Sequence, residues 1–349
     1  MSNEPSTAAS DDTIRPSREN ALPAETARES QEIIPWRGRK FGRFLIIRSL
    51  RGGGCASVHV VLNEENGEPR ALKVLSRRLG DQDYFAQREN MRRESDVMRK
   101  ISHPHLVRYI SDGEYCGIPY IEMELLQGPA LDTILRAQSP TQRFPPRKIL
   151  GWIRPICGAL AKLHDHGVIH RDVKPSNIVI DDVLGPVLLD FGVAYVPETL
   201  TDIPSPIGEV EGTLSYFSPE QARGDDASPQ MDIFSLAATI ARATHNQCPY
   251  GEDSANVMVE RAMHGEIITL PSRPDLPNEL TRFLNRGMHP DPSQRPKDMA
   301  EFMKELDRVI VACEEHENLL AHNLIPMGAV LCYFGAAFII GGVLGYLFA

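Results

Sequence analysis

Two residue patterns are missing from this chain of 349 residues, and each absence excludes a class of protein. Its six cysteines include no C-x-x-C pair, which argues against a zinc site or a disulfide framework. Scattered single thiols are typical of a reducing compartment. Acidic residues outnumber basic ones: the chain has 47 Asp and Glu but 37 Lys and Arg, and its formal net charge is −10. No nucleic acid partner is expected, because binding phosphates requires a basic surface.

The first 39 residues lack apolar runs. Their longest is the pair Ile33–Ile34, and the rest is rich in Ser, Thr, Glu, Asp, Asn and Pro. Such a segment cannot bury enough surface to offset its ordering entropy, so residues 1–39 are predicted to be a disordered tail. The segment also lacks the apolar core of a secretory signal, so we expect the N-terminus to stay in the cytoplasm.

The C-terminal part lacks charge instead. Glu317 is the last formally charged residue, and residues 324–349 are almost uniformly apolar. About 20 helical residues cross a hydrocarbon core of about 30 Å. The sequence therefore predicts a juxtamembrane linker over 312–326 and a single-pass transmembrane helix over 327–348. A buried core helix, or a helix used in oligomer packing, is the alternative.

Small residues recur within this predicted span. Gly341 and Gly345 are four positions apart, and Ala337 lies four positions earlier. Residues of this size at this spacing let two membrane helices approach closely, which favours a homodimer. Glycine is also generally frequent in membrane helices, so the spacing alone leaves dimerisation open.

Between these ends, the chain begins with a β pattern. The apolar run from Phe44 to Leu50 is followed by a glycine-rich turn, a second strand and the hairpin signal Asn66-Gly67. A third strand follows over residues 71–75, so an antiparallel sheet is predicted. A glycine-rich turn between two strands can bring backbone N–H groups close to phosphates.

The next segment, residues 83–102, is predicted to be a helix. Met91, Val97, Met98 and Ile101 fall on the same face as Glu94. An inward carboxylate needs a cation, because burying an unpaired charge is costly, and Lys73 is the natural partner. The pattern equally allows Glu94 to reach solvent at the edge of the apolar stripe.

Two motifs further along carry more information. His170-Arg171-Asp172, followed by Asn177, matches H-R-D-x-x-x-x-N, and Asp190-Phe191-Gly192 matches D-F-G. In these residues the chain closely resembles the protein kinase family, and in detail the bacterial eukaryotic-like serine/threonine kinases. The resemblance covers residues 44 to about 311.

The resemblance implies an α+β, two-lobed kinase-like fold for residues 40–311. The N-lobe, an antiparallel sheet with one helix, would extend to about residue 124. The larger, mainly helical C-lobe would begin at about residue 128. The need for ATP also favours placing this domain in the cytoplasm, with the membrane as a partner only through the C-terminal helix.

The resemblance also implies roles for individual side chains. Lys73, held by Glu94, would bind the α- and β-phosphates of ATP. Asp190 and Asn177 would hold Mg²⁺, which prefers oxygen ligands. Asp172 would orient the substrate hydroxyl and accept its proton, and Lys174 would contact the transferred phosphate.

Adenine would lie against Val58 and Ala71, with Met123 at the back of the pocket and the backbone of Glu124 and Leu126 at the adenine edge. The glycine-rich segment expected over the nucleotide comprises Leu50, Arg51, Gly52, Gly53, Gly54, Cys55, Ala56, Ser57 and Val58. Two of its residues depart from the family pattern, because Arg51 and Ala56 occupy positions where glycine is usual. Arg51 in particular could weaken nucleotide binding.

Later motifs complete the resemblance. Thr213 and Glu220 lie in a segment similar to the one that ends in A-P-E, Asp232 matches the aspartate that braces the catalytic loop, and Arg295 would pair with Glu220. His170, Arg171, Phe191 and Gly192 would have structural or regulatory roles. Thr199, Thr201 and Ser205 are candidate phosphorylation sites that Arg171 could pair with.

The sequence thus predicts an ATP- and Mg²⁺-dependent serine/threonine protein kinase that acts on protein substrates, autophosphorylates and is tethered to the membrane. A membrane-anchored pseudokinase scaffold is the alternative, which Arg51 favours and the five motif residues Lys73, Glu94, Asp172, Asn177 and Asp190 oppose. A small-molecule kinase of the aminoglycoside type would lack Lys174 and the segment from Gly212 to Glu220.

Overall fold

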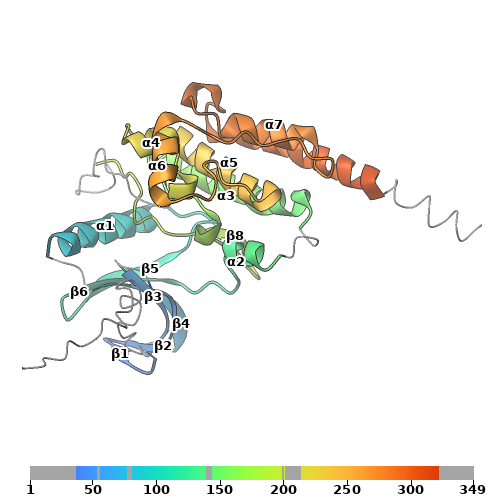
Figure 1. The fold of residues 1–349 in the computed structure, drawn as a ribbon. Helices are drawn as coiled ribbons and strands as arrows, with labels where there is room; N and C mark the ends of the chain where they lie inside the picture. Colours follow the sequence, from blue (N-terminus) through green and yellow to red (C-terminus); the bar gives the residue numbers. More distant parts are fainter. Residues whose placement is uncertain are drawn as a thin grey trace, which may run out of the picture.

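The computed structural model describes residues 37–52, 56–76, 81–138, 144–198, 200 and 214–321, with residue 51 and residues 81–83 described in their backbone alone. The described chain forms two lobes, a sheet with one long helix and a larger group of helices (Figure 1). The predicted α+β, two-lobed fold is therefore confirmed.

The N-lobe is a six-stranded antiparallel sheet in the order β1-β2-β3-β4-β6-β5. Its strands are β1 (Lys40–Phe41), β2 (Phe44–Gly52), β3 (Ala56–Asn63), β4 (Glu68–Leu75), β5 (Tyr109–Tyr115) and β6 (Ile118–Glu124). The predicted hairpin at Asn66-Gly67 joins β3 to β4, and Gly67 adopts a φ of +72° that favours glycine.

The register of the sheet decides which side chains share a face. Val58 lies opposite Lys73, and Ala71 lies opposite Met123. Residues two apart on a strand point the same way, so Val58, Lys73, Ala71 and Met123 all share one face. On the other face a second small core forms, made of Phe41, Phe44, Ile46, Val61, Leu72 and Val74.

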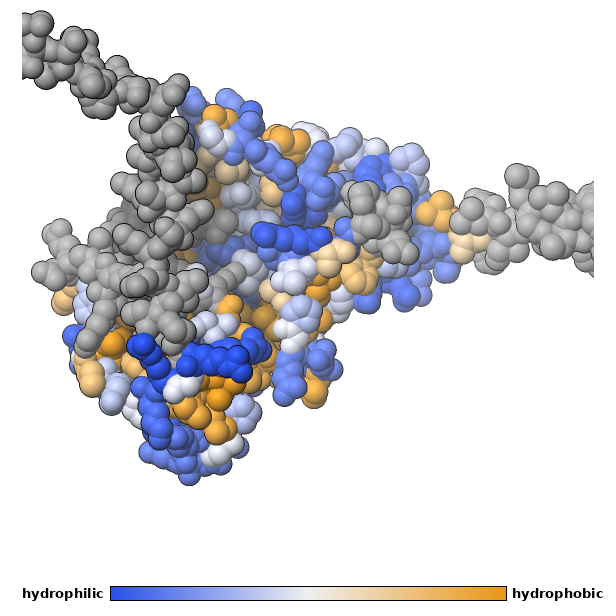
Figure 2. All heavy atoms as spheres, turned by 60° about the horizontal axis from the view of Figure 1, so that its bottom comes forward, coloured by the Kyte–Doolittle hydropathy of each residue, from blue (hydrophilic) through white to orange (hydrophobic). Residues whose placement is uncertain are grey.

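Helix α1 (Asp81–Lys100) covers part of the first face. Met91, Val97 and Met98 are buried in the main core, as the apolar pattern predicts. The helix covers Asp81–Lys100 rather than the predicted residues 83–102. Figure 2 shows apolar side chains on the end of the molecule that carries the sheet. Ile47 and Leu50 of β2 are exposed apolar residues of this sheet.

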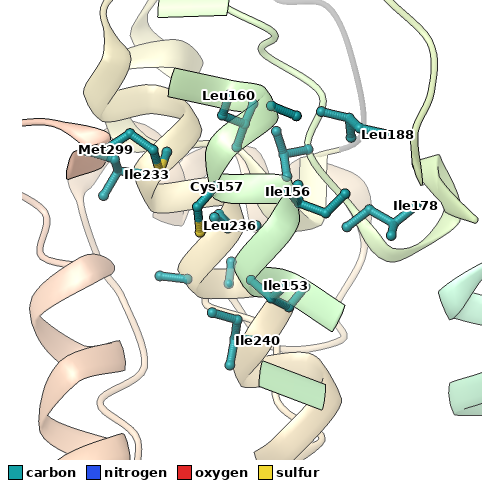
Figure 3. Close-up of a cluster of buried hydrophobic side chains, with 14 of the residues drawn as sticks. Ile153, Ile156, Cys157, Leu160, Ile178, Leu188, Ile233, Leu236, Ile240 and Met299 are labelled. Carbon is teal, nitrogen blue, oxygen red and sulfur yellow. The ribbon is translucent and has the colours of Figure 1, made fainter. Parts of the chain in front are cut away.

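The C-lobe is built around two helices, α3 (Pro146–His164) and α5 (Pro229–His245). Their facing apolar side chains pack with Ile178 and Leu188 of a small hairpin and with Met299 (Figure 3). Nearly every residue of α5 is buried, which is typical of a helix in the centre of a domain. The remaining elements are α2 (Leu131–Arg136), β7 (Ile178–Asp181), β8 (Gly185–Leu188), α4 (Pro219–Arg223), α6 (Ala255–His264), α7 (Asn278–Gly287) and the short helices Pro175–Asn177, Leu214–Tyr216 and Pro292–Gln294.

The last described helix covers residues 299–321 and packs against α3. Its buried face includes Phe302, Leu306 and Cys313, and Asp307 forms an ion pair of 3.0 Å with Arg154 of α3. The helix thus continues beyond residue 311, the predicted end of the kinase domain. In the part of the chain that the structure describes, no helix is both long and apolar enough to span a membrane. The predicted span 327–348 and most of the predicted tail lie outside the described residues.

Candidate active site

Three charged side chains from distant parts of the chain meet between the lobes. Lys73 comes from β4, Glu94 from the middle of α1, and Asp190 from the segment after β8. The ammonium of Lys73 donates to both oxygens of Glu94, at 2.8 and 2.6 Å, and to Oδ1 of Asp190 at 2.8 Å. The predicted partnership of Lys73 with Glu94 is therefore confirmed, and Glu94 points inward.

The environment perturbs the pKa of each of these groups. Burial alone would lower the pKa of Lys73, but the carboxylates of Asp190 and Glu94 raise it above its usual value. The charge of Lys73 holds the pKa of Asp190 well below its usual range. Burial raises the pKa of Glu94, against the attraction of Lys73. Lys73 is therefore held as a cation and Asp190 as an anion.

Asp172 is the centre of a second cluster. Lys174 donates to both of its carboxylate oxygens, at 2.9 and 2.7 Å. The amide nitrogen of Asn177 donates to Oδ2 of Asp172 at 2.9 Å and to its carbonyl oxygen at 3.0 Å. Two side chains from a single turn of chain thus fix the orientation of the carboxylate.

The carboxylate of Asp232, on α5, accepts hydrogen bonds from the backbone of the loop that carries Asp172. Its Oδ1 accepts from the N–H of Arg171 at 2.8 Å, and its Oδ2 from the N–H of His170 at 2.9 Å. His164, at the end of α3, lies 2.8 Å from Oδ2 as well. Burial alone would raise the pKa of Asp232, but these hydrogen bonds lower it. The brace predicted for Asp232 is present, while His164 was missed by the sequence analysis.

Two non-glycine residues of the site have left-handed backbone. The φ angle is 64° at Arg171 and 69° at Asp190. Residues other than glycine rarely adopt this region, and where they do, the surrounding structure must hold them there. Here Arg171 is held by the hydrogen bond that its N–H donates to Asp232, and Asp190 is held by its ion pair with Lys73.

The side chains of His170 and Phe191 link the two motifs. Their ring centroids are 5.4 Å apart, and both residues are buried. His170 Nε2 also lies 3.1 Å from the carbonyl oxygen of Leu189, next to Asp190. Gly192 donates its N–H to Asp190 Oδ1 at 3.3 Å. These contacts fix the segment of Asp190 against the loop of Asp172.

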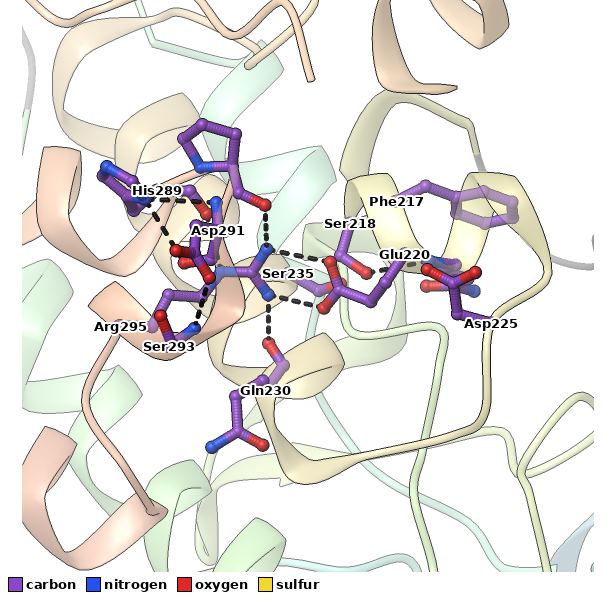
Figure 4. Close-up of polar contacts among 12 residues, drawn as sticks. Phe217, Ser218, Glu220, Asp225, Gln230, Ser235, His289, Asp291, Ser293 and Arg295 are labelled. Carbon is purple, nitrogen blue, oxygen red and sulfur yellow. Dashed lines mark hydrogen bonds and ion pairs between the residues drawn. The ribbon is translucent and has the colours of Figure 1, made fainter. Parts of the chain in front are cut away.

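A buried ion pair joins α4 to the end of the C-lobe (Figure 4). The guanidinium of Arg295 donates to Oε1 and Oε2 of Glu220 at 2.6 and 2.8 Å. It also donates to the carbonyl oxygens of His289 and Gln230, at 2.7 and 2.9 Å. The predicted pairing of Arg295 with Glu220 is confirmed, and the carbonyl partners are additional.

The segment between the lobes is shaped by contacts that the sequence analysis missed. Asp181 of β7 accepts from the N–H of Gln127 at 2.5 Å. Gly128 has a φ of 158°, and a Cβ at this position would lie 2.0 Å from the carbonyl oxygen of Ile180. The N–H of Glu124 donates to the carbonyl oxygen of Arg108 at 3.0 Å. Glycine at 128 therefore allows the connection to pass close to β7.

The predicted nucleotide-binding residues are only partly described. Val58, Ala71 and Met123 share the face of the sheet that carries Lys73, as their register requires. Gly52, Ala56 and Ser57 lie at the ends of β2 and β3, Leu50 of β2 is exposed, and Leu126 follows β6. Several predicted residues lie outside the described part: Gly53, Gly54, Cys55, Thr199, Thr201, Ser205, Thr213 and the side chain of Arg51.

A metal ion bound at this site would need phosphate oxygens as ligands in addition to the side chains of the protein. Across the described ranges, no group of three or more His, Cys, Asp or Glu side chains is arranged to hold one. The amide nitrogen of Asn177 faces Asp172, so its carbonyl oxygen faces away, and Asp190 uses only Oδ1 in its bonds to Lys73 and Gly192. One amide oxygen and one carboxylate fit a hard divalent cation that also binds phosphate oxygens.

Comparison with known proteins gives consistent matches. Residues 44–306 match the family described as "Protein kinase domain". The serine/threonine-protein kinase PknD of Mycobacterium tuberculosis is 28% identical over 294 residues, which cover 82% of this chain and 42% of that protein. The serine/threonine-protein kinase PknH of Mycobacterium bovis is 33% identical over 262 residues, which cover 74% of this chain and 42% of that protein.

Among solved structures, the kinase domain of PknI from Mycobacterium tuberculosis superposes with a TM-score of 0.58 at 25% identity. The match covers 78% of this chain and 98% of that domain. The chain spans about two fifths of the length of the curated relatives above. Motifs, geometry and matched length agree, and the chain belongs to the protein kinase family, with a domain of the serine/threonine type.

Proposed function

We propose that this protein transfers the γ-phosphate of ATP to serine or threonine hydroxyls of other proteins, with Mg²⁺ as cofactor. The observation that carries the proposal is a pair of charged clusters that the contacts of His170 with Phe191 and Leu189 hold together. Glu94 and Asp190 hold Lys73 as a cation. Lys174 and Asn177 orient the carboxylate of Asp172, which would accept the proton of the substrate hydroxyl. Phosphoryl transfer needs this combination of charge stabilisation and positioning.

In the proposed reaction, the hydroxyl oxygen of the substrate forms a bond to the γ-phosphorus while the bond from that phosphorus to the β–γ bridging oxygen breaks. ADP leaves with that oxygen, and the hydroxyl proton passes to the carboxylate of Asp172. Lys174 lies beside Asp172 and would stabilise the negative charge on the transferred group. Lys73 would leave Asp190 to bind the α- and β-phosphates, while Glu94 keeps its ammonium in place.

The cofactor would be held by Asp190 and by the carbonyl oxygen of Asn177. When bound, Mg²⁺ neutralises charge on the phosphate oxygens. The protein contributes Asp190 in its ionised form, because Lys73 keeps its pKa low, and an Asn177 whose orientation Asp172 fixes. Adenine would lie against Val58, Ala71 and Met123, with the backbone of Glu124 and Leu126 at its edge.

The test is transfer of labelled phosphate from γ-labelled ATP to a generic acceptor protein, with phosphoamino acid analysis of the product. The full chain should label serine or threonine, and Asp172→Asn should reduce the rate by about 10²-fold or more. Asp226→Asn, at an exposed aspartate, is the matched control and should keep the rate. Equal rates for the full chain and Asp172→Asn would reject the proposal and favour a pseudokinase scaffold.

We also propose that residues 327–348 anchor the kinase to a membrane, with the domain of residues 40–311 in the cytoplasm. The support is the uncharged apolar length of this segment in the sequence. The full chain should sediment with membranes and resist extraction by carbonate, and a chain ending at residue 321 should not. Recovery of the full chain in the supernatant would reject the anchor.

Autophosphorylation in a homodimer is a related proposal. Two copies joined through Gly341 and Gly345 would have a high local concentration and phosphorylate Thr199, Thr201 or Ser205 in each other. Replacing both glycines by Leu should lower autophosphorylation in membranes. An unchanged level would exclude this route.

A further inference from the structure

A polar pocket of about 500 Å³ opens directly beside the catalytic loop. Lys174, Pro175 and Ser176 form one wall, and Ser215 and Tyr216 form another. Lys174 also donates to both oxygens of Asp172. A single side chain is therefore shared between the pocket and the proposed acceptor of the substrate proton. Residues that flank the phosphorylated hydroxyl of a protein substrate would lie within reach of this pocket.

The pocket is also lined by the cation Arg242, in the last turn of α5. Its side chain is 29% exposed, and it lies close enough to Tyr216 and Cys248 to interact with both. Its guanidinium donates to Glu252 at 2.6 Å. Glu252 belongs to the loop between α5 and α6, and its side chain is 72% exposed. The cation is thus held by a helix, while its partner extends into water from a loop.

The other acidic side chains of the pocket have different partners. Asp253 is paired at 2.6 Å with Arg261, which is not part of the pocket wall and is also bonded to the carbonyl oxygen of Tyr250. Asp132 is paired with Arg136 four residues later, within the same short helix α2. The side chain of Arg136 is 78% exposed, so water screens its attraction to an anion. Arg242 is less exposed than Arg136 and its partner Glu252 is an exposed side chain of a loop, so an incoming anion can replace Glu252 while Arg242 stays in place.

We propose that Arg242 binds an anionic side chain of the protein substrate, and that Glu252 occupies this position until the substrate displaces it. The proposal rests on the kinase function above and deepens it by naming an acidic substrate class. Arginine binds carboxylates and phosphates through two parallel hydrogen bonds, so a glutamate, an aspartate or an already phosphorylated residue can fill the site. Exchange of one carboxylate for another leaves no charge unpaired, since the released Glu252 returns to water.

The experiment uses the full chain and a set of threonine peptides in a neutral background. Each peptide carries Glu, Gln, Lys or phosphoserine at one flanking position, and every position is scanned in turn. The readout is the ratio of kcat/KM for the Glu peptide to that for the Gln peptide, taken within each variant. This ratio does not depend on the absolute activity or on the folded fraction of a variant.

The full chain should prefer Glu over Gln by about tenfold at one position or two adjacent positions. Arg242→Gln should bring the ratio close to one, and Arg242→Glu should reverse it in favour of Lys. Glu252→Gln removes the competing carboxylate at an exposed position and should increase the ratio. Arg223→Gln, at an exposed arginine outside the pocket, should leave it unchanged. A phosphoserine preferred over Glu would identify a phosphorylated residue as the ligand, and equal rates would identify a carboxylate as sufficient.

Four results would overturn the inference. A ratio near one at every position in the full chain would reject an anion site while leaving the kinase function intact. A preference for Lys would point instead to Asp132. A ratio that Arg242→Gln does not change would assign any acidic preference to other residues. Failure to phosphorylate any peptide would reject the kinase function together with this inference.

Discussion

Two sites in this protein hold a glutamate against a cation, and their surroundings differ in a way that matches their proposed roles. Arg295 is completely buried, and five of its hydrogen bonds go to Glu220 and to backbone carbonyls. Lys73 is shared by Glu94 and Asp190, and the side chain of Asp190 is 37% exposed. The side chain of Glu220 is only 6% exposed, so its pair with Arg295 serves to hold α4 to the end of the C-lobe. Lys73 has one exposed partner, so its ammonium can exchange the carboxylate of Asp190 for a phosphate group of a ligand.

The largest effect on stability is expected at the buried site. Arg295→Ala should destabilise the domain by about 3–5 kcal/mol, because it leaves the carboxylate of Glu220 buried without its cation. Urea unfolding, followed by fluorescence, measures the change. Lys297→Ala, at a side chain that is 79% exposed, is the control and should change stability little. A loss at Arg295 no larger than that at Lys297 would remove the distinction between the two sites.

At Lys73 we expect a large effect on the reaction rate and a smaller effect on stability. Lys73→Met should reduce kcat/KM for phosphate transfer by about 10²–10³-fold, since it removes a cation that stabilises phosphate charge. It should cost less stability than Arg295→Ala, because burial already raises the pKa of Glu94 and the carboxyl group can take up a proton. Initial rates and urea unfolding on the same variant measure both effects. Lys40→Met, at a side chain 64% exposed, is the control.

The connection between the lobes depends on one glycine. Gly128→Ala should destabilise the protein by about 1–3 kcal/mol, because the new Cβ would lie against the carbonyl oxygen of Ile180 and the backbone would be strained. Gly151→Ala, in α3 with open space around it, should stabilise by about 0.5–1 kcal/mol. Thermal unfolding of the pair tests the prediction, and equal shifts for both variants would contradict it.

The smallest effect concerns pH and the N-lobe sheet. His59 is 1% exposed, its ring nitrogens lie 3.0 and 2.8 Å from the hydroxyls of Ser49 and Ser57, and burial lowers its pKa. Because the unfolded chain binds the proton more readily, His59 stabilises the fold above pH ~6.5, and this contribution is lost as the pH falls below that value.

Unfolding curves at pH 7.5 and 5.5 compare the full chain with His59→Asn. The variant should lose less stability than the full chain between these two conditions, since it has no imidazole to protonate. Parallel losses would show that the pKa of His59 is the same in the folded and unfolded states, which would contradict the prediction.

The sequence predicted those features of the site that short segments encode. The motif of His170 to Asn177 predicted that Asp172, Lys174 and Asn177 act at one site, but not the hydrogen bonds that Lys174 and Asn177 donate to Asp172. The apolar face of α1 predicted where Glu94 lies but not how deeply, and the structure shows it 2% exposed. The hairpin followed from the turn signal at Asn66-Gly67, whereas the strand register was learned from the structure.

Other contacts could not be predicted, because they join distant segments through groups that have no sequence signature. His164 meets Asp232 across 68 positions, and Asp181 reaches Gln127 across 54. Three of the acceptors around Arg295 are backbone carbonyls, which every residue carries. The charge pattern around Arg242 likewise depends on how α5 packs beside the loop of Glu252.

The most direct test of the account is calorimetric titration of the full chain with ATP, with and without Mg²⁺. When ATP and Mg²⁺ bind, Lys73 should release Asp190 and contact the phosphates, and Asp190 should bind the metal. Mg²⁺ should therefore strengthen ATP binding. Asp190→Asn should abolish that strengthening while leaving the domain folded. Binding that is absent, or that Asp190→Asn leaves unchanged, would contradict the account.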